Sequence, residues 1–151
     1  MVSELGVSFD DVFAAAGPAP RAAEPAAEPE AHVAEEGRVQ RADSRRVIEL
    51  ESGVRWERLT TWNDRDVDFL YTTYEVGGAS SPEGKLVRHS GREFGIVFSG
   101  RLGVTVGFEE HVLEPGDSIS FESTVPHRLH NDGDEVVTAI WVVLGRYPQS
   151  P

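Results

Sequence analysis

Residues 85–131, KLVRHSGREFGIVFSGRLGVTVGFEEHVLEPGDSISFESTVPHRLHN, alternate short β-like runs with turns such as Ser99-Gly100. Three side chains that can bind a metal lie near the ends of these runs, namely His89, Glu93 and His127. Strand ends that neighbour one another in a closed sheet bring such side chains together. The segment therefore predicts a small β-barrel whose open mouth gathers these three groups.

Period-two patterns continue the β prediction from residue 46 onward. The run at 114–117 is Glu-Pro-Gly-Asp, and proline followed by glycine favours a type II turn because glycine supplies the positive φ. The segments expected to be strands are 47–50, 54–59, 67–76, 85–89, 93–98, 102–108, 119–121, 126–130 and 135–144. Short strands at regular spacing, without a helical pattern between them, indicate an all-β sandwich or barrel.

Two strands carry specific expectations about burial. Leu102, Val104, Val106 and Phe108 share one face by alternation, and we expect all four to point inward. The run 135–144 is apolar on both faces, which predicts a strand that is covered on both sides.

Composition limits the classes of function. The 151 residues carry a formal net charge of −12, and an acidic surface repels phosphates and disfavours direct nucleic-acid binding. The chain has no cysteine, so disulfides and thiolate metal sites are excluded. No signal peptide is visible, and no apolar run approaches the ~20 residues of a membrane span, so we expect a cytoplasmic protein without membrane contact.

The N-terminal third has a different composition from the rest. Residues 1–16 carry a short helical pattern, with Gly6 able to end one helix and Ser8 able to cap the next. Residues 17–44 are rich in Ala, Pro and Glu over most of their length and predict a disordered linker, after which 45–147 form the barrel domain. The arginines of 37–46 suit a nucleic-acid patch or, as we favour, a solvated flank of the first strand.

The three polar groups have a spacing that suits metal chemistry. His89 and Glu93 lie four residues apart across a tight link, so a turn there can bring their side chains to one point. His127 begins a later strand directly after Pro126. Two histidines and one carboxylate suit Fe(II), Mn(II), Ni(II) or Zn(II), and they leave coordination positions open. The sequence thus predicts a possible divalent metal as cofactor.

Residues 85–131 resemble the two short motifs of the cupin superfamily. The matching positions are His89, Glu93 and Gly100 for the first motif, and Gly116, Pro126, His127 and Asn131 for the second. The resemblance covers about residues 67–144 and implies the cupin double-stranded β-helix, a jelly-roll barrel. Val87 stands where the first motif usually has another histidine, and by strand alternation Val87 and His89 point the same way.

The whole chain is similar to the helix-turn-helix/cupin transcriptional regulators of the XRE type. Residues 1–16 look like the end of their repressor-type DNA-binding domain, although a weakly amphipathic tail would give the same pattern. Because most of that domain is missing, we expect no DNA binding by this chain alone. The resemblance implies a homodimer and a small-molecule effector in the barrel mouth. The side chains expected to contact the effector, besides the three metal-binding candidates, are Arg88, Tyr71, Tyr74 and Trp141.

The same three residues also support an enzyme. Members of the cupin superfamily include dioxygenases, epoxidases and isomerases that use such metal sites. The sequence identifies no further general acid or base, so no reaction and no catalytic residue can be named. The other candidate histidines, His111 and His130, are expected to be surface residues.

Overall fold

A computed structural model describes residues 2–4 and 37–146 of the chain. In this part the chain forms two β-sheets, with one short 3-10 turn at Ala42–Ser44. The expected all-β fold is confirmed. None of the helices in these residues has the length and hydropathy needed to cross a membrane.

The first sheet, called sheet A, contains five strands in the order β1-β5-β10-β7-β8. Their bounds are β1 Val2–Glu4, β5 Leu86–Arg88, β10 His127–His130, β7 Leu102–Val106 and β8 Glu109–Leu113. All pairings are antiparallel except that between β1 and β5, which is parallel.

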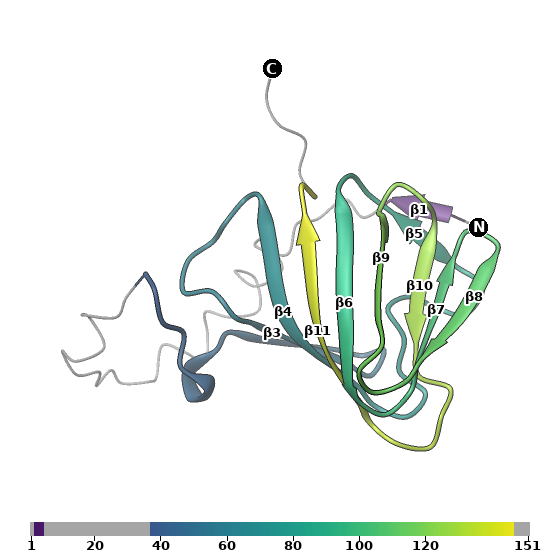
Figure 1. Ribbon diagram of the computed structural model, residues 1–151, viewed down its shortest axis with the longest axis horizontal. Helices are drawn as coiled ribbons and strands as arrows, with labels where there is room; N and C mark the ends of the chain where they lie inside the picture. Colours follow the sequence, from purple (N-terminus) through teal and green to yellow (C-terminus); the bar gives the residue numbers. More distant parts are fainter. Residues whose placement is uncertain (1, 5–36, 147–151) are drawn as a thin grey trace.

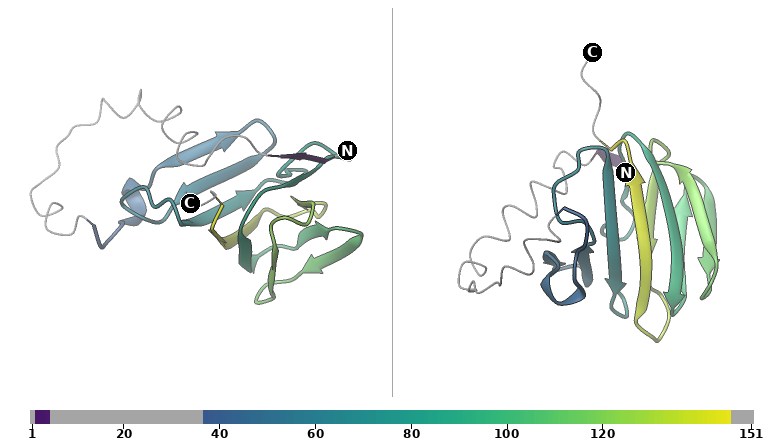
Figure 2. Two further views of the ribbon diagram at one scale, coloured as in Figure 1. Left: turned by 90° about the horizontal axis from the view of Figure 1, so that it is seen from above. Right: turned by 60° about the vertical axis from the view of Figure 1, so that its left-hand side comes forward.

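The second sheet, called sheet B, contains six antiparallel strands in the order β2-β3-β4-β11-β6-β9. Their bounds are β2 Val47–Leu50, β3 Val54–Arg58, β4 Val67–Tyr74, β11 Val137–Leu144, β6 Arg92–Ser99 and β9 Ser118–Glu122. Figures 1 and 2 show the two sheets facing each other, with the β7–β8 hairpin at the edge far from β2 and β3.

The core lies between the sheets and is built from alternate residues of each strand. On β11, for example, Val137, Ala139, Trp141 and Val143 are buried, while the residues between them face outward. The buried apolar side chains form one cluster, which includes Leu70, Val97, Leu102, Val104 and Leu129. Burial of this face from both sheets supplies the main driving force for closing the barrel.

Most predicted strands and turns are confirmed. The turn at 114–117 has the expected positive φ at Gly116, and the Asp117 amide donates to the Glu114 carbonyl at 2.8 Å. One burial prediction is wrong, because Phe108 is fully exposed whereas Leu102 and Val104 are buried. Strand β7 ends at Val106, and the following turn breaks the alternation before Phe108.

The first residues of the chain also differ from the prediction. Val2–Glu4 form strand β1, which pairs with Leu86–Arg88 of β5, whereas the sequence favoured a helix there. The physical reason is that β5 would otherwise present an unpaired edge, and an edge strand accepts any neighbouring chain that can complete its ladder. The predicted helix and cap at residues 5–16, and residues 17–36 of the linker, lie outside the described residues.

Candidate metal centre

The two sheets together bring the three predicted metal ligands to one point. His89 directly follows β5 and His127 begins β10, and both of these strands belong to sheet A. Glu93 is the second residue of β6 in sheet B, and its side chain points inward. The site therefore lies inside the barrel, at the end where the β5–β6 link joins the two sheets.

The link between β5 and β6 is held by contacts that leave room only for glycine. A Cβ atom on Gly91 would lie 2.2 Å from the carbonyl oxygen of Leu144, so a side chain there is excluded. The hydroxyl of Ser90 donates to the Gly145 carbonyl at 3.1 Å. The amide of His89 donates to the carbonyl of Ser123 at 3.0 Å. These contacts fix the backbone that carries His89 and leads into Glu93.

Glu93 lies between the two imidazoles. Its Oε2 is 2.9 Å from His89 Nε2 and 3.0 Å from His127 Nε2. The three side chains are buried, with exposed fractions of 5%, 4% and 3% for His89, Glu93 and His127. The prediction that these groups converge is confirmed by this geometry, and suitable ligand atoms of all three lie within 4.8 Å of one another.

Backbone carbonyls orient both histidine rings. His89 Nδ1 lies 2.9 Å from the Ser90 carbonyl, and His127 Nδ1 lies 2.8 Å from the Val125 carbonyl. A carbonyl oxygen only accepts, so each Nδ1 carries a proton and each Nε2 is directed at Glu93. A ring held by its Nδ1–H in this way presents Nε2 as a metal ligand, which is the usual arrangement of metal-binding histidines.

The donor set fits a divalent metal. Two neutral Nε2 lone pairs would face a carboxylate oxygen without a proton between them, so the cluster requires either extra protons or a cation at its centre. The N–O separations of 2.9 and 3.0 Å are short enough for these atoms to share one ion at ligand distances of about 2.0–2.2 Å. His89, Glu93 and His127 would hold the ion, which would supply a Lewis acid with open positions.

The electrostatics of the cluster favour the charged forms of Glu93 and His127. Burial alone would raise the pKa of Glu93, but hydrogen bonds from His127 and His89, the charge of His127 and the N–H of Trp141 hold it far below its usual range. Burial opposes the charged form of His127, yet its contact with Glu93 raises the pKa above the ordinary value. Glu93 is thus held as a preformed anion beside His127, and each stabilises the charged form of the other.

Trp141 belongs to the site, but its role is to hold Glu93 in place. Its Nε1–H donates to Glu93 Oε1 at 2.8 Å, so Oε2 remains directed at the histidines. The indole lies on Gly95 of the neighbouring strand, where a Cβ atom would come within 2.0 Å of the ring. The sequence predicted Trp141 as a ligand contact and did not reveal this bond. A glycine inside an apolar strand is the signal that could have indicated the close approach.

Val87 and Phe121 complete the wall around the imidazoles. Val87 is the direct antiparallel partner of His127 and is buried, as expected for a position that faces the site. The ring of Phe121 on β9 lies 5.0 Å from that of His127. Valine at position 87 thus gives the site an apolar side where the resemblance expected a fourth ligand.

The structure separates the remaining predicted contact residues. Tyr74 is buried in the barrel, where burial and the charge of Glu93 raise the pKa of its hydroxyl, so it stays protonated. Tyr71 lies on the outer face of sheet B, with its ring 6.5 Å from that of Phe98. Arg88 is exposed at the end of β5 and lies between the inward-facing Val87 and His89. Placing Tyr71 and Arg88 in the mouth was wrong, because alternation turns both away from the triad.

A buried ion pair near the site was not predicted. Arg146 Nε donates to Asp68 Oδ2 at 3.1 Å, and both side chains are at most 7% exposed. Asp68 pairs with Val143, which also pairs with Glu93, so the two carboxylates occupy the same level of sheet B. The charge of Arg146 lowers the pKa of His127, against the larger effect of Glu93. An inward aspartate in an apolar strand was the available signal.

The other motif residue, Asn131, holds the barrel rather than the site. It is fully buried, and its amide donates to the carbonyls of Tyr74, Glu75 and Glu135. Of the remaining histidines, His111 is exposed on β8 as expected. His130 is buried against Gly103, which corrects the expectation that it lies at the surface.

Fold, motif positions and triad geometry together define a cupin barrel with a two-histidine, one-glutamate site. Residues 70–143 match the Cupin domain family (Cupin_2), and this part of the chain is a cupin domain. The chain is also similar to the HTH-type transcriptional regulator PuuR of Escherichia coli (strain K12), with 26% identity over 68 residues. That match spans 45% of this chain and 35% of the regulator, so it concerns about a third of the relative.

Solved structures give the same fold. An RmlC-like cupin from Shewanella frigidimarina has a TM-score of 0.62 at 14% identity, covering 74% of this chain and 93% of that one. The Cupin_2 domain of an XRE family transcriptional regulator from Enterobacter cloacae has a TM-score of 0.53 at 22% identity, covering 64% and 99%. Fe(II)-HppE has a TM-score of 0.58 at 22% identity, covering 70% of this chain and 59% of HppE.

Proposed function

We propose that the barrel is a sensor module that binds a small molecule at the metal centre of a transcriptional-regulator-like protein. The observation that carries this proposal is the buried convergence of His89, Glu93 and His127 in a domain similar to regulator cupins. A binding site needs few polar groups in an apolar enclosure, and this cluster provides them.

The residues around the centre suit recognition better than proton transfer. Tyr74 can donate a hydrogen bond but is not a base, because its hydroxyl stays protonated. Asp68 is engaged by Arg146, and Glu93 is held by the N–H of Trp141 and would be a ligand of the metal. A ligand donating a lone pair to a held ion would then be bound without being transformed. The effector then acts by shifting the population of a dimer or domain arrangement.

We expect the sensor module not to bind DNA by itself. The chain carries 26 acidic against 14 basic residues, which repels a phosphate backbone. An electrophoretic shift assay with random-sequence duplex at low salt checks this expectation, and a salt-sensitive complex at micromolar protein would contradict it.

Calorimetric titration tests the sensor proposal. The metal-loaded wild-type protein is titrated with amines, amino acids, carboxylic acids and sugar phosphates in separate runs. We expect saturable binding of one chemical class, lost in Glu93→Gln and retained in Glu109→Gln, whose carboxylate is exposed on β8 beside His111. Binding of no class, or binding that Glu93→Gln leaves unchanged, would refute the proposal.

A second candidate function is a metal-dependent enzyme, and the open-sided ligand set favours it. Two histidines and one carboxylate leave positions for substrate and for O₂ or water. Incubation of the Fe(II)-loaded protein with the bound class of small molecule, followed by mass spectrometry of that molecule, separates the two functions. The sensor proposal expects the molecule to be recovered unchanged, with the same stoichiometry of binding before and after exposure to air.

A further inference from the structure

A fully buried serine lies in the loop between β9 and β10. In the part of the chain that the structure describes, the hydroxyl of Ser123 has no hydrogen-bond partner. Buried hydroxyls are nearly always hydrogen-bonded, because burial removes the bonds that water would otherwise make. An exception calls for an explanation, and a ligand that binds next to the hydroxyl provides one.

Backbone hydrogen bonds place Ser123 against the metal centre. Its carbonyl accepts from the His89 amide at 3.0 Å, and its amide donates to the Gly91 carbonyl at 2.8 Å. Two residues further along the same loop, the Val125 carbonyl holds the ring of His127 at 2.8 Å. The loop that carries Ser123 therefore contacts both of the segments that carry a histidine of the triad, and the serine is buried beside them.

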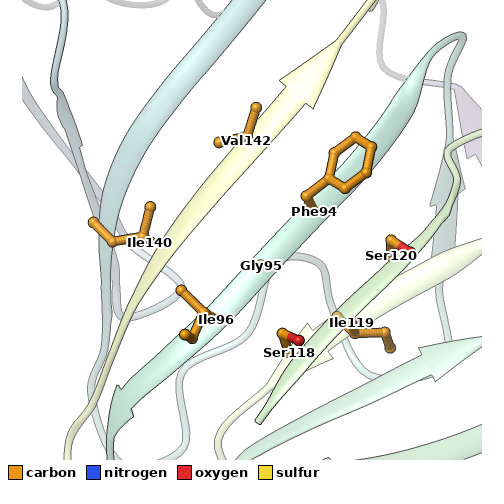
Figure 3. A pocket seen from close by; sticks show the side chains of 8 residues that line it. All are labelled: Phe94, Gly95, Ile96, Ser118, Ile119, Ser120, Ile140 and Val142. Carbon is orange, nitrogen blue, oxygen red and sulfur yellow. The ribbon is translucent and has the colours of Figure 1, made fainter. Parts of the chain in front are cut away.

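The serines of this region lie on opposite sides of sheet B. Ser118 and Ser120 of β9 border a hollow on the outer face of the sheet (Figure 3). Phe121 points inward, where its ring lies 5.0 Å from that of His127. Ser123 follows Phe121 by two residues, so alternation keeps it on the inner side, in agreement with its burial. Only the inner serine is thus placed to contact a ligand of the metal centre.

The charge of the centre selects the kind of ligand. A divalent ion held by one carboxylate, Glu93, and by two neutral imidazoles leaves one positive charge unbalanced. The three protein ligands are at most 5% exposed, and an unbalanced charge is costly in such a site. The nearby pair of Asp68 with Arg146 contributes one charge of each sign and does not change the balance. A singly charged anion would neutralise the centre, whereas an amine would not.

We propose that Ser123 is a ligand-binding residue and that the ligand of the metal centre is a small carboxylate. One carboxylate oxygen binds the held ion, and the other accepts a hydrogen bond from the Ser123 hydroxyl. A hydrogen bond to a charged acceptor is of the stronger kind. Val87 and Phe121 give the site an apolar side that suits a short hydrocarbon substituent. This inference rests on the sensor function proposed above and names the chemical class that the sensor binds.

Titration of the Co(II)-loaded full chain with acetate and with acetamide tests the charge of the ligand. The visible absorption of Co(II) reports a ligand that enters its coordination sphere. Acetamide has the shape of acetate without the charge, so we expect acetate to bind at least about 10-fold more tightly. Equal affinities of the two compounds would overturn the assignment of an anion.

Ser123→Ala tests the role of the hydroxyl. We expect the affinity for acetate to fall at least about 10-fold, because the hydrogen bond to the charged oxygen is lost. The affinity for Co(II) should stay within about 3-fold, since no ligand atom of the metal is removed. Ser120→Ala is the matched control, because it removes an outward hydroxyl, and it should change neither affinity. An unchanged acetate affinity in Ser123→Ala would overturn the proposal.

Urea denaturation of the metal-free protein gives a readout that a structural role would not produce. The midpoint for Ser123→Ala should be no lower than that of the wild type, because alanine removes a buried hydroxyl that has no partner among the described residues. A lower midpoint would show that the hydroxyl supports the fold and would contradict its assignment to a ligand.

The two proposals can fail separately. In the calorimetric panel, saturable binding of amines or sugar phosphates without binding of acetate would leave the sensor function standing and overturn the carboxylate class. Binding of no class would overturn both. Binding of acetate that depends on Glu93 and on Ser123 would support both.

Discussion

The inner and outer faces of sheet B each carry side chains that are unusual for their surroundings. Its inner face contains buried charged groups, Glu93 and Asp68, within an otherwise apolar core. Its outer face contains exposed apolar groups where water should be. Both arrangements cost stability in the isolated fold, since a buried charge needs a partner and an exposed apolar surface needs cover. The comparison indicates that the buried charges on the inside and the exposed apolar side chains on the outside each call for a partner, which we propose to be a metal ion for the inner face.

Protein groups neutralise the two buried carboxylates of the inner face to different degrees. Asp68 has Arg146 as a close cationic partner, whereas Glu93 depends on two histidines and the N–H of Trp141. A histidine is positively charged only at sufficiently low pH, so the charge pairing of Glu93 depends on pH. Arginine stays charged, so the pairing of Asp68 with Arg146 does not. This difference predicts that perturbations at Glu93 affect metal binding and that those at the outer face do not.

The largest effect is expected for Glu93→Gln. The amide keeps the shape of the side chain but removes the only anionic ligand, so affinity for Zn(II) or Mn(II) should fall by at least about 100-fold. Calorimetric titration of the metal-free protein measures the change. Glu122→Gln removes an exposed carboxylate from the neighbouring strand and should leave affinity within about twofold. Equal affinities in the two variants would contradict the assignment of Glu93.

The next largest effect is expected for Trp141→Phe. The phenyl ring still fills the space over Gly95, but the donor that holds Glu93 Oε1 is lost. Removal of such a supporting hydrogen bond typically lowers metal affinity by about 10–100-fold, and we expect a value in this range. Gly95→Ala should displace the indole and lower the free energy of unfolding by about 1–3 kcal/mol, which urea denaturation measures. Full affinity in Trp141→Phe would assign the indole to packing alone.

A gain of affinity is expected for Val87→His. Position 87 lies directly opposite His127, so an imidazole there can become a fourth ligand. Metal affinity should rise by at least about 10-fold, or ~1.4 kcal/mol. Val142→His adds the same group to the outer face and should change nothing at the centre. A drop in the affinity of Val87→His, with the fold intact, would argue that position 87 does not face the site.

The smallest effect is expected for the pH dependence of the stability of the metal-free protein. The pKa of His127 is raised above 6.5, so its contact with Glu93 contributes stability below about pH 6.5 and loses it as pH rises through the raised pKa. The pKa of Glu93 is lowered from 4.5, so its contribution is present above about pH 4.5 and is lost only in strong acid. Thermal unfolding should therefore show maximal stability between these limits and a decline at alkaline pH.

Two comparisons check the origin of that decline. Glu93→Gln should weaken it, while Glu109→Gln should keep it, because Glu109 pairs with the exposed His111. In the metal-loaded protein the trend should reverse, since a bound ion competes with the proton on His127 and gains affinity as pH rises. A decline of equal size in Glu93→Gln would place its cause elsewhere in the barrel.

Local patterns were sufficient to predict the barrel and the triad. Alternation and turn residues act over a few positions, so strands such as 47–50 and the turn at Gly116 could be placed from sequence. Two contacts could not be predicted in this way, that of Trp141 with Glu93 and that of Arg146 with Asp68. They depend on which distant strands become neighbours, and local patterns carry no information about strand order. Tyr71 lies between the buried residues Leu70 and Thr72, so strand alternation places it on the outer face of sheet B and not in the mouth.

The apolar character of the outer face of sheet B was predicted from the sequence, but what covers this face was not. The run 135–144 was expected to be covered on both sides, and within the described residues only the side of Trp141 is fully covered. Apolar periodicity reports that a face needs cover but does not say what supplies it, because intramolecular and intermolecular burial use the same residues.

The central claim is that His89, Glu93 and His127 hold a divalent ion, and metal content tests it most directly. The wild type, His127→Ala and His111→Ala are purified without chelator, loaded anaerobically with Fe(II), desalted and subjected to elemental analysis. The account predicts about one ion per chain in the wild type and in His111→Ala, and less than about one-tenth in His127→Ala. Less than about one-tenth in the wild type, or equal content in His127→Ala and His111→Ala, would contradict it.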